Sequence, residues 1–180
     1  HWSSRGGSLR GCSLIQNHAL RSGGGLAARD GQIRLSDCLV RLNSAGNTGG
    51  GFSFQRTEAV VLRTVLAENL GGLAGGALSC LDASPTFQHC TFHGNDADGD
   101  GTVLSLMRAN PAFEACVITG SGSLLVEASD SRPTLTGSNV LPTGASPAPQ
   151  WPGILAQQQS SAGNLAVDPR YCAPEAGDFH

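Results

Sequence analysis

The feature that most constrains this chain is a sequence pattern that returns every 26 residues. Three kinds of residue keep this interval: the glycines Gly23, Gly49 and Gly75, the asparagines Asn17, Asn43, Asn69 and Asn95, and the cysteines Cys12, Cys38, Cys90 and Cys116, with Thr64 in the intervening cysteine position. Three columns with one period indicate a repeat architecture, in which each unit buries its apolar face against its neighbours.

Apolar residues within each repeat recur with the spacing of β-strands. The four columns are Leu26, Phe52, Leu78, Leu104 and Val126; Ala28, Phe54, Cys80, Leu106 and Ala128; Leu35, Val61, Phe87, Phe113 and Leu135; and Leu14, Val40, Leu66, Phe92, Ile118 and Val140. The second column follows the first by two residues, which places both on one face of a strand. No window has helical periodicity. The predicted fold is all-β: a parallel β-helix, or solenoid, of about five to six coils of ~26 residues.

The columns divide the chain into successive coils. The predicted coils are Leu9 to Ser22, Gly23 to Thr48, Gly49 to Ala74, Gly75 to Asp100, Gly101 to Ser123 with four residues deleted after Ile118, and Leu124 to about Thr143. We therefore assign residues 1–141 to the β-helix, 142–163, rich in Pro, Ala, Gly and Ser, to a linker, and 164–180 to an irregular, cap-like tail. Because the pattern is already established at Leu9, we expect earlier coils to be missing at the N-terminus.

Two polar columns have a structural interpretation. The asparagines lie at a corner, where they tolerate left-handed backbone and can bond to one another along the stack, so we expect an asparagine ladder that ends at Asn95. A second column alternates in charge: Asp30, Arg56, Asp82, Arg108 and Asp130. Unlike charges on adjacent strands attract, and a slip by one coil would oppose like charges, so this column is predicted to fix the register.

The repeat unit resembles a known family of bacterial surface repeats. Gly75-Gly76-Ala77-Leu78 followed by Phe92-His93-Gly94-Asn95 is similar to the GGA[IL]…FxxN repeats of polymorphic outer-membrane proteins. The segment from Gly163 to Phe179 resembles the element that closes right-handed β-helix regions of large secreted bacterial proteins. The resemblance implies a right-handed coil, a secreted or cell-surface location, and an adhesin-like role. It carries over no catalytic residue.

The densest acidic sequence is Asp96, Asp98 and Asp100, followed by Gly101. These residues match the start of an EF-hand loop, but Met107 stands where the loop requires glutamate, so a true EF-hand is excluded. Three hard carboxylates on one turn still suit Ca²⁺, so Asp96, Asp98 and Asp100 are the candidate calcium ligands. The simpler interpretation, which we favour, is a solvated acidic corner.

His89, His93 and the cysteines are given structural interpretations. His89 and His93 are expected on the outer face of one strand, without a third metal ligand nearby. In-register side chains keep the sulfurs of the main cysteine column pointing the same way, so these cysteines are predicted to be reduced and buried as small apolar groups. Cys172 would pair only with a tail that folds back or with another chain.

Composition narrows the possible partners. The net charge is −3 with no basic cluster, which argues against nucleic acid, and no apolar run is long enough for a membrane-spanning helix. The favoured function is a structural or adhesin-like segment that binds carbohydrate or a host or cell-surface protein. The alternatives are a carbohydrate-binding module and a polysaccharide lyase or glycoside hydrolase that uses Asp96, Asp98 and Asp100. No cofactor other than Ca²⁺ is predicted.

Overall fold

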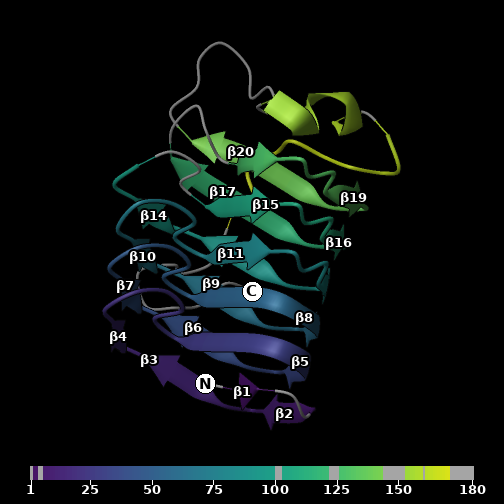
Figure 1. Cartoon of the computed structure of the whole chain (residues 1–180). Helices are drawn as coiled ribbons and strands as arrows, with labels where there is room; N and C mark the ends of the chain where they lie inside the picture. The colour runs from purple at the N-terminus through teal and green to yellow at the C-terminus, as the bar shows by residue number, and fades with distance from the viewer. Residues whose placement is uncertain are drawn as a thin grey trace.

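The chain folds into a parallel β-solenoid of about five turns, seen from the side in Figure 1. This computed structural model describes residues 2–3, 6–99, 103–121, 126–143, 153–159 and 161–170. Every pairing between its strands is parallel, and each strand pairs with its equivalent in the coils before and after. The predicted all-β parallel solenoid is therefore confirmed. Among the described residues, no helix has the length and apolar character needed to cross a bilayer.

Three stacked sheets form the walls of the solenoid. The first comprises β1 (Trp2–Ser3), β2 (Gly7–Arg10), β5 (Leu26–Ser36), β8 (Phe52–Leu62), β11 (Leu78–Leu81), β12 (Thr86–Gln88), β15 (Leu104–Met107), β16 (Ala112–Glu114), β18 (Val126–Ser129) and β19 (Thr134–Thr136). The second comprises β3 (Ser13–Ile15), β6 (Leu39–Arg41), β9 (Val65–Ala67), β13 (Thr91–His93), β17 (Val117–Ser121) and β20 (Asn139–Thr143). The third comprises β4 (His18–Ala19), β7 (Ser44–Ala45), β10 (Leu70–Gly71) and β14 (Asp96–Ala97).

The strand register reproduces the apolar columns of the sequence. Leu78 lies beside Phe52 on one side and Leu104 on the other, and Phe87 lies between Val61 and Phe113. The offset falls to 22 residues in the next coil, where Leu104 pairs with Val126. This is the four-residue deletion predicted after Ile118, and the stack continues through it without a change of register.

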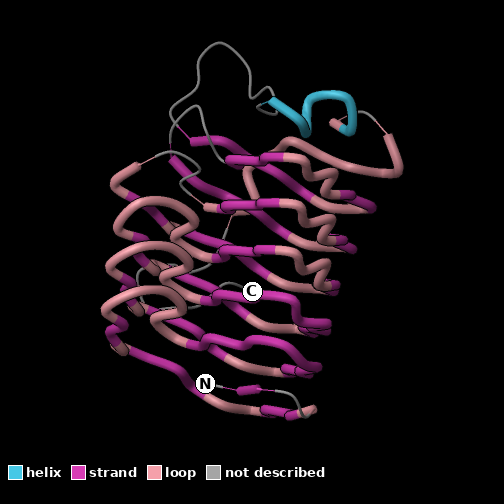
Figure 2. The backbone as a smooth tube through the Cα atoms, viewed as in Figure 1, coloured by secondary structure: helices cyan, strands magenta, loops and turns pink. Residues whose placement is uncertain are grey.

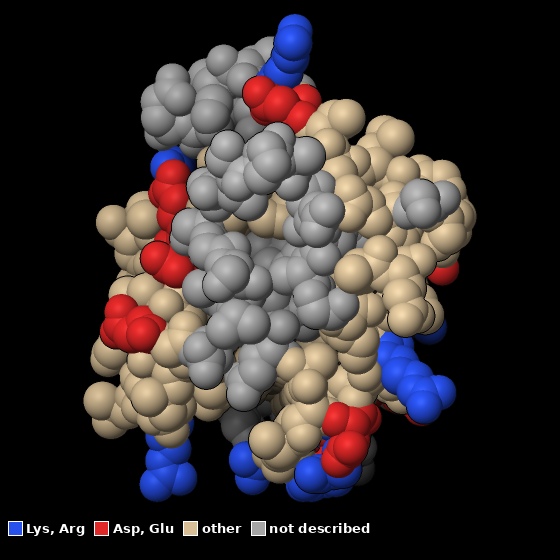
Figure 3. Space-filling model, turned by 90° about the horizontal axis from the view of Figure 1, so that it is seen from above, with Lys and Arg blue, Asp and Glu red and all other residues tan. Residues whose placement is uncertain are grey.

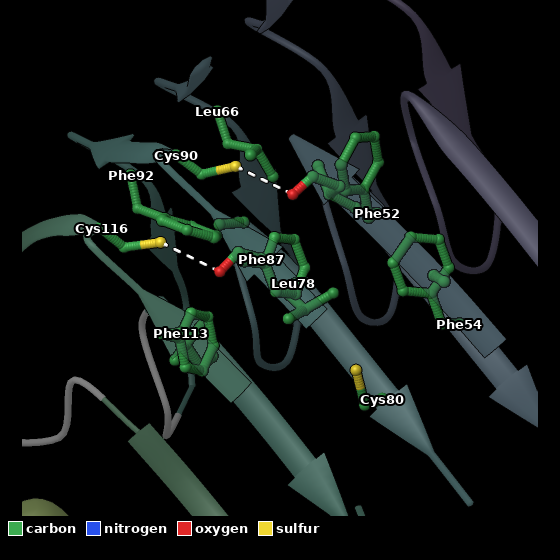
Figure 4. Close-up of a cluster of buried hydrophobic side chains, with 14 of the residues drawn as sticks. Phe52, Phe54, Leu66, Leu78, Cys80, Phe87, Cys90, Phe92, Phe113 and Cys116 are labelled. Carbon is green, nitrogen blue, oxygen red and sulfur yellow. Dashed lines mark hydrogen bonds between the residues drawn. The ribbon is translucent and has the colours of Figure 1, made fainter. Parts of the chain in front are cut away.

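The interior is filled by aromatic and aliphatic side chains from these columns. Phe87 stacks on Phe113 with ring centroids 5.2 Å apart, and Phe92 meets both rings edge-on (Figure 4). Phe52 and Phe54 stack in the coil below. All five rings are almost fully buried. Each buried aromatic ring removes a large apolar area from water, so this row supplies much of the driving force for stacking.

The glycine triplets exist because the third sheet approaches the first closely. Gly75 has a positive φ of 63°, the left-handed region that glycine adopts most readily. Its neighbour Gly76 is packed so tightly that an added Cβ would collide with the carbonyl oxygen of Asp96 in β14. Gly50 stands in the same relation to Leu70 in β10. Ala77 shows that the third position accepts a methyl group.

The C-terminal part of the solenoid has a simpler cross-section. The third sheet ends at β14, and the described part of the next two coils adds no strand to it (Figure 2). The 3₁₀-helix η1 (Gly153–Gln158) then lies across the end of the stack, where Leu155 is buried and Gln158 bonds to the backbone of Leu135 and Pro133. The sequence places this helix in the segment predicted to be a linker, 142–163.

The chain then adds a further rung to the stack. Asn164 lies 26 residues after Ser138 and accepts a hydrogen bond from its backbone nitrogen at 2.9 Å. Leu165 pairs in parallel with Asn139, and Val167 exchanges hydrogen bonds with the side chain of Asn139. The described beginning of the predicted tail therefore continues the solenoid at its second sheet. The boundaries at 141, 163 and 180 stay a prediction.

Candidate functional site

The predicted calcium site lies at the corner that carries β14. Asp96 and Asp98 are both exposed, and the intervening Ala97 is buried, so the two carboxylates project from the same outer face. The corner is held by backbone bonds from Asp96 N to Asn69 O and from Asp98 N to Gly71 O. One oxygen of Asp96 accepts the backbone N–H of Ala97 at 2.9 Å.

The third predicted ligand, Asp100, lies outside the described residues. Among the residues that the structure does describe, no group of three or more histidine, cysteine, aspartate or glutamate side chains could hold a metal ion. The structure thus brings Asp96 and Asp98 to one exposed face and leaves the calcium site itself a prediction.

The asparagine column forms the predicted ladder, and its members beyond Asn17 are buried. The side-chain oxygen of Asn69 accepts both the backbone N–H of Asn43 at 3.0 Å and its side-chain amide at 2.9 Å. The side-chain oxygen of Asn95 accepts the same two hydrogen bonds from Asn69. The side-chain amides of Asn43, Asn69 and Asn95 also donate to a carbonyl of the preceding coil, as Asn69 does to Val40. Because buried amides are costly unless paired, this continuous pairing explains why only asparagine occupies the column.

The alternating charge column also forms, as two bidentate ion pairs. The guanidinium of Arg56 donates hydrogen bonds of 2.5 and 2.9 Å to the carboxylate of Asp30. Arg108 donates hydrogen bonds of 2.7 and 3.0 Å to Asp82. The hydrogen bond from Arg56 holds the pKa of Asp30 below its usual value, and Arg108 does the same for Asp82. Asp130 lies near Arg108 without joining these bidentate contacts.

All five residues of this column have positive φ, between 47° and 55°. They form a one-residue corner, and the column Asp37, Arg63, His89 and Ala115 forms another. Arg63 and Asp37 pair across that second corner at 2.6 and 3.0 Å. The arginines in these corners were not expected from residue type, because residues other than glycine, asparagine and aspartate rarely adopt this backbone conformation.

The cysteine column is inward, as predicted, and its described members are free thiols. Their thiols also form hydrogen bonds with backbone carbonyl groups, in addition to filling apolar space. The thiol of Cys90 donates to Gln88 O at 3.3 Å and Val61 O at 3.5 Å, and the thiol of Cys116 bonds to Phe87 O (Figure 4). Ser138 and Thr64 use their hydroxyls in the same way. The column therefore selects a small inward donor, which the presence of Thr64 already indicated.

Burial raises the pKa of the Cys80 thiol, and the hydrogen bond with the Cys116 thiol together with burial raises the pKa of Cys90. The same hydrogen bond lowers the pKa of Cys116. Since the thiolate is the reactive species, Cys80 and Cys90 are structural.

The two histidines do not share a strand, so that part of the sequence interpretation is wrong. His89 is exposed at the corner between β12 and β13, whereas His93 lies on β13 and contacts the hydroxyl of Thr119 at 3.0 Å through Nδ1. Burial lowers the pKa of His93, and the carboxylate of Glu68 opposes that shift. Glu68 itself is held by Arg41 at 2.9 and 3.2 Å.

Two surface depressions complete the candidate sites. One, of about 560 Å³, lies between η1 and the corner that joins β18 to β19, and both Asp130 and Arg132 line it. The other, of about 220 Å³, lies between the loops of the first coils and the outer face of β5 and β8. Viewed from above, charged side chains gather at the rim of the stack, with acidic ones along the left side of the view (Figure 3).

Comparison with models of known protein families finds no match to this chain, and no curated protein matches it. The sheets, ladders and depressions described above are therefore the basis for proposing a function.

Proposed function

We propose that this chain is a structural, adhesin-like segment of a secreted bacterial cell-surface protein, a rigid body that displays or binds other molecules without catalysing a reaction. The supporting observation is the continuity of the buried amide ladder. Asn43, Asn69 and Asn95 tie each coil to the next through paired hydrogen bonds of 2.8–3.0 Å. A stack joined in this way along its axis resists shear and bending between coils, because sliding would leave buried amides unpaired.

The exterior supports the same proposal. The Asp30–Arg56 and Asp82–Arg108 pairs join successive coils on the outside, with side chains roughly half exposed. Exposed pairs add little to stability. Displacement by one coil would bring like charges together, so their alternation favours a single register. We therefore assign these charged residues a structural role in keeping the coils in register.

The proposed location at a bacterial cell surface rests on the sequence of the repeat. The sequences from Gly75 to Leu78 and from Phe92 to Asn95 resemble the repeats of polymorphic outer-membrane proteins. The partners of such a segment would be carbohydrate or a protein of a host or cell surface.

A stretching experiment tests the mechanical role. The full chain is tethered between two handles and pulled, alongside the Asn69→Ala variant and the control Asn17→Ala, which removes the exposed end member of the ladder. We expect Asn69→Ala to lower the unfolding force clearly and Asn17→Ala to change it little. Equal forces for all three proteins would contradict a load-resisting ladder.

An activity screen tests the catalytic alternative. The chain is incubated with uronate-containing and neutral polysaccharides, with and without Ca²⁺, and reducing ends and unsaturated uronate are measured. We expect no turnover. Turnover that disappears when Asp96, Asp98 and Asp100 are changed to asparagine would overturn the proposal and assign these residues to the active site of a lyase or hydrolase.

A further inference from the structure

A groove beside the first coils combines two arginines with neutral hydrogen-bonding groups. Its volume is about 220 Å³, and it is lined by Arg21, Ser22, Ala27, Ala28, Arg29, Asn47, Ser53 and Gln55. One wall comes from the loops that follow β4 and β7, and the other from the outward-facing side chains at the start of β5 and β8. The groove is thus built from two coils. The strands β4 and β7 of the third sheet, which directly precede its first wall, lie on the left of Figure 1.

The charge of the groove is positive. Arg21 and Arg29 are both exposed, and none of the described lining residues is acidic. The acidic residue next in sequence, Asp30, is held by two hydrogen bonds from Arg56, although Arg29 is near enough to help lower its pKa. The surroundings are also basic: eight of the eleven arginines precede Thr64, whereas eleven of the fourteen acidic residues follow it.

The remaining lining groups match the hydroxyls of a sugar. The hydroxyls of Ser22 and Ser53 and the amides of Asn47 and Gln55 can both donate and accept hydrogen bonds. Ser53 is also in register with Ser79 and, beyond it, with Ser105. These outward serines extend the polar face along the stack from the groove, as a chain of linked sugars would require.

We propose that this groove binds an acidic oligosaccharide, with Arg21 and Arg29 gripping its carboxylate or sulfate groups. A guanidinium offers a planar fork of N–H donors that fits such an anion with two parallel bonds. No described lining residue is aromatic, so a neutral sugar finds no ring to stack on. The affinity therefore depends on the charge of the sugar and falls as salt is raised.

Calorimetric titration of the full chain tests this assignment. The probes are an oligogalacturonate, a sulfated heparin-derived oligosaccharide and a neutral maltooligosaccharide of matched length. The variant is Arg21→Gln/Arg29→Gln, and the control is Arg34→Gln/Arg132→Gln, which removes the same charge from exposed positions outside the groove. Circular dichroism and thermal melting verify that both variants are folded.

We expect at least one acidic probe to bind, the neutral probe not to bind, and the groove variant to weaken binding by about tenfold or more. The control variant should stay within about twofold, and raising NaCl to about 0.5 M should abolish binding. Carboxylate-bearing and sulfated sugars are distinguished by which acidic probe binds. Equal binding of the neutral sugar, equal loss in the control variant, or no binding of either acidic probe would overturn the assignment. None of these outcomes depends on the mechanical role proposed above.

Discussion

The first four coils and the last two coils of this solenoid share an interior but differ at one corner. In both regions the strands continue in register, with Leu78 paired to Leu104 and Leu104 paired to Val126. Among the residues that the structure describes, only those of the first region form the third sheet, the glycine triplets and the buried asparagine ladder. In the second region the offset between coils is four residues shorter.

This difference shows that the stacking of the coils and the shape of their cross-section depend on different residues of the repeat. Apolar columns make the coils stack, and they tolerate the loss of a corner because their strands are unchanged. The corner residues decide the cross-section. Gly76 and Asn95 are required where a third strand packs closely, whereas the next coil has Thr102 in the sequence position of Gly76, and the described residues after β14 add no strand there.

The largest effect is expected from Gly76→Ala in the first region. The new Cβ would collide with the carbonyl oxygen of Asp96, so the third sheet must move away and the free energy of unfolding should fall by about 4 kcal/mol or more. Gly137→Ala in the second region is the control. Its Cβ meets nothing within 4 Å, and its positive φ of 56° costs about 1–2 kcal/mol. Urea unfolding measures both, and equal losses would contradict the comparison.

Asn69→Ala is expected to have the next largest effect. It leaves the backbone and side-chain donors of Asn43 and the carbonyl of Val40 without their partner, a loss of about 3 kcal/mol. Asn17→Ala, at the exposed end of the ladder, should cost about 1 kcal/mol or less. Chemical unfolding measures the free energy lost in each variant. Similar losses in the two variants would show that the buried part of the ladder does not stabilise the first region.

A smaller effect is expected in the cysteine column, which runs through both regions. Cys90→Ser should cost about 1 kcal/mol or less, because a hydroxyl can bond to Gln88 O as Ser138 bonds to Thr136 O. Cys90→Ala should cost about 2 kcal/mol, since it loses the donor and leaves a cavity. Thermal unfolding ranks the two variants. A serine variant less stable than the alanine variant would show that the column selects apolar groups instead.

The smallest effect is expected from the ion pairs, and it depends on pH. The pKa values of Asp30 and Asp82 are lowered in the folded chain, so their contribution to stability is present above the unfolded aspartate pKa near 3.8 and is lost as pH falls through the lower folded values. Arg56→Gln/Arg108→Gln should flatten the decline of Tm between pH 6 and pH 2.5. Arg34→Gln/Arg132→Gln, which removes two other exposed arginines, should leave that decline unchanged, and an identical slope in all three proteins would exclude the pairs as its cause.

The stacking could be predicted from the sequence because each of its determinants recurs with one period. The columns of Leu78 and Phe87, the asparagine ladder and the Asp30–Arg56 alternation all follow from residue type and interval. The deletion after Ile118 could be located because the same columns resume after it at Val126. The repetition of each column thus supports a prediction of strand positions and register that the sequence of a single coil could not support.

The one-residue corners recur with the period, but Arg56 and Arg63 gave no reason to expect them, because arginine rarely adopts positive φ and the surrounding strands hold it there. Features without repetition could not be predicted either. The helix η1 occurs once, so no column marks Leu155 as buried. Asn164 could have been found, because it follows Ser138 by one full period. The groove of Arg21 and Arg29 depends on loops whose projection only the structure reveals.

The most direct test of a stack fixed by its buried ladder is hydrogen–deuterium exchange of the full chain, read by mass spectrometry of its peptides. Peptides that contain Asn43, Asn69 and the strands beside them should exchange last, and those from β18 to β20 should exchange earlier, because the ladder and the third sheet lie in the first region as far as the structure describes the chain. In Asn69→Ala the protection of the first region should fall to that of the second. Equal protection of the two regions, unchanged by Asn69→Ala, would contradict the role assigned to the ladder.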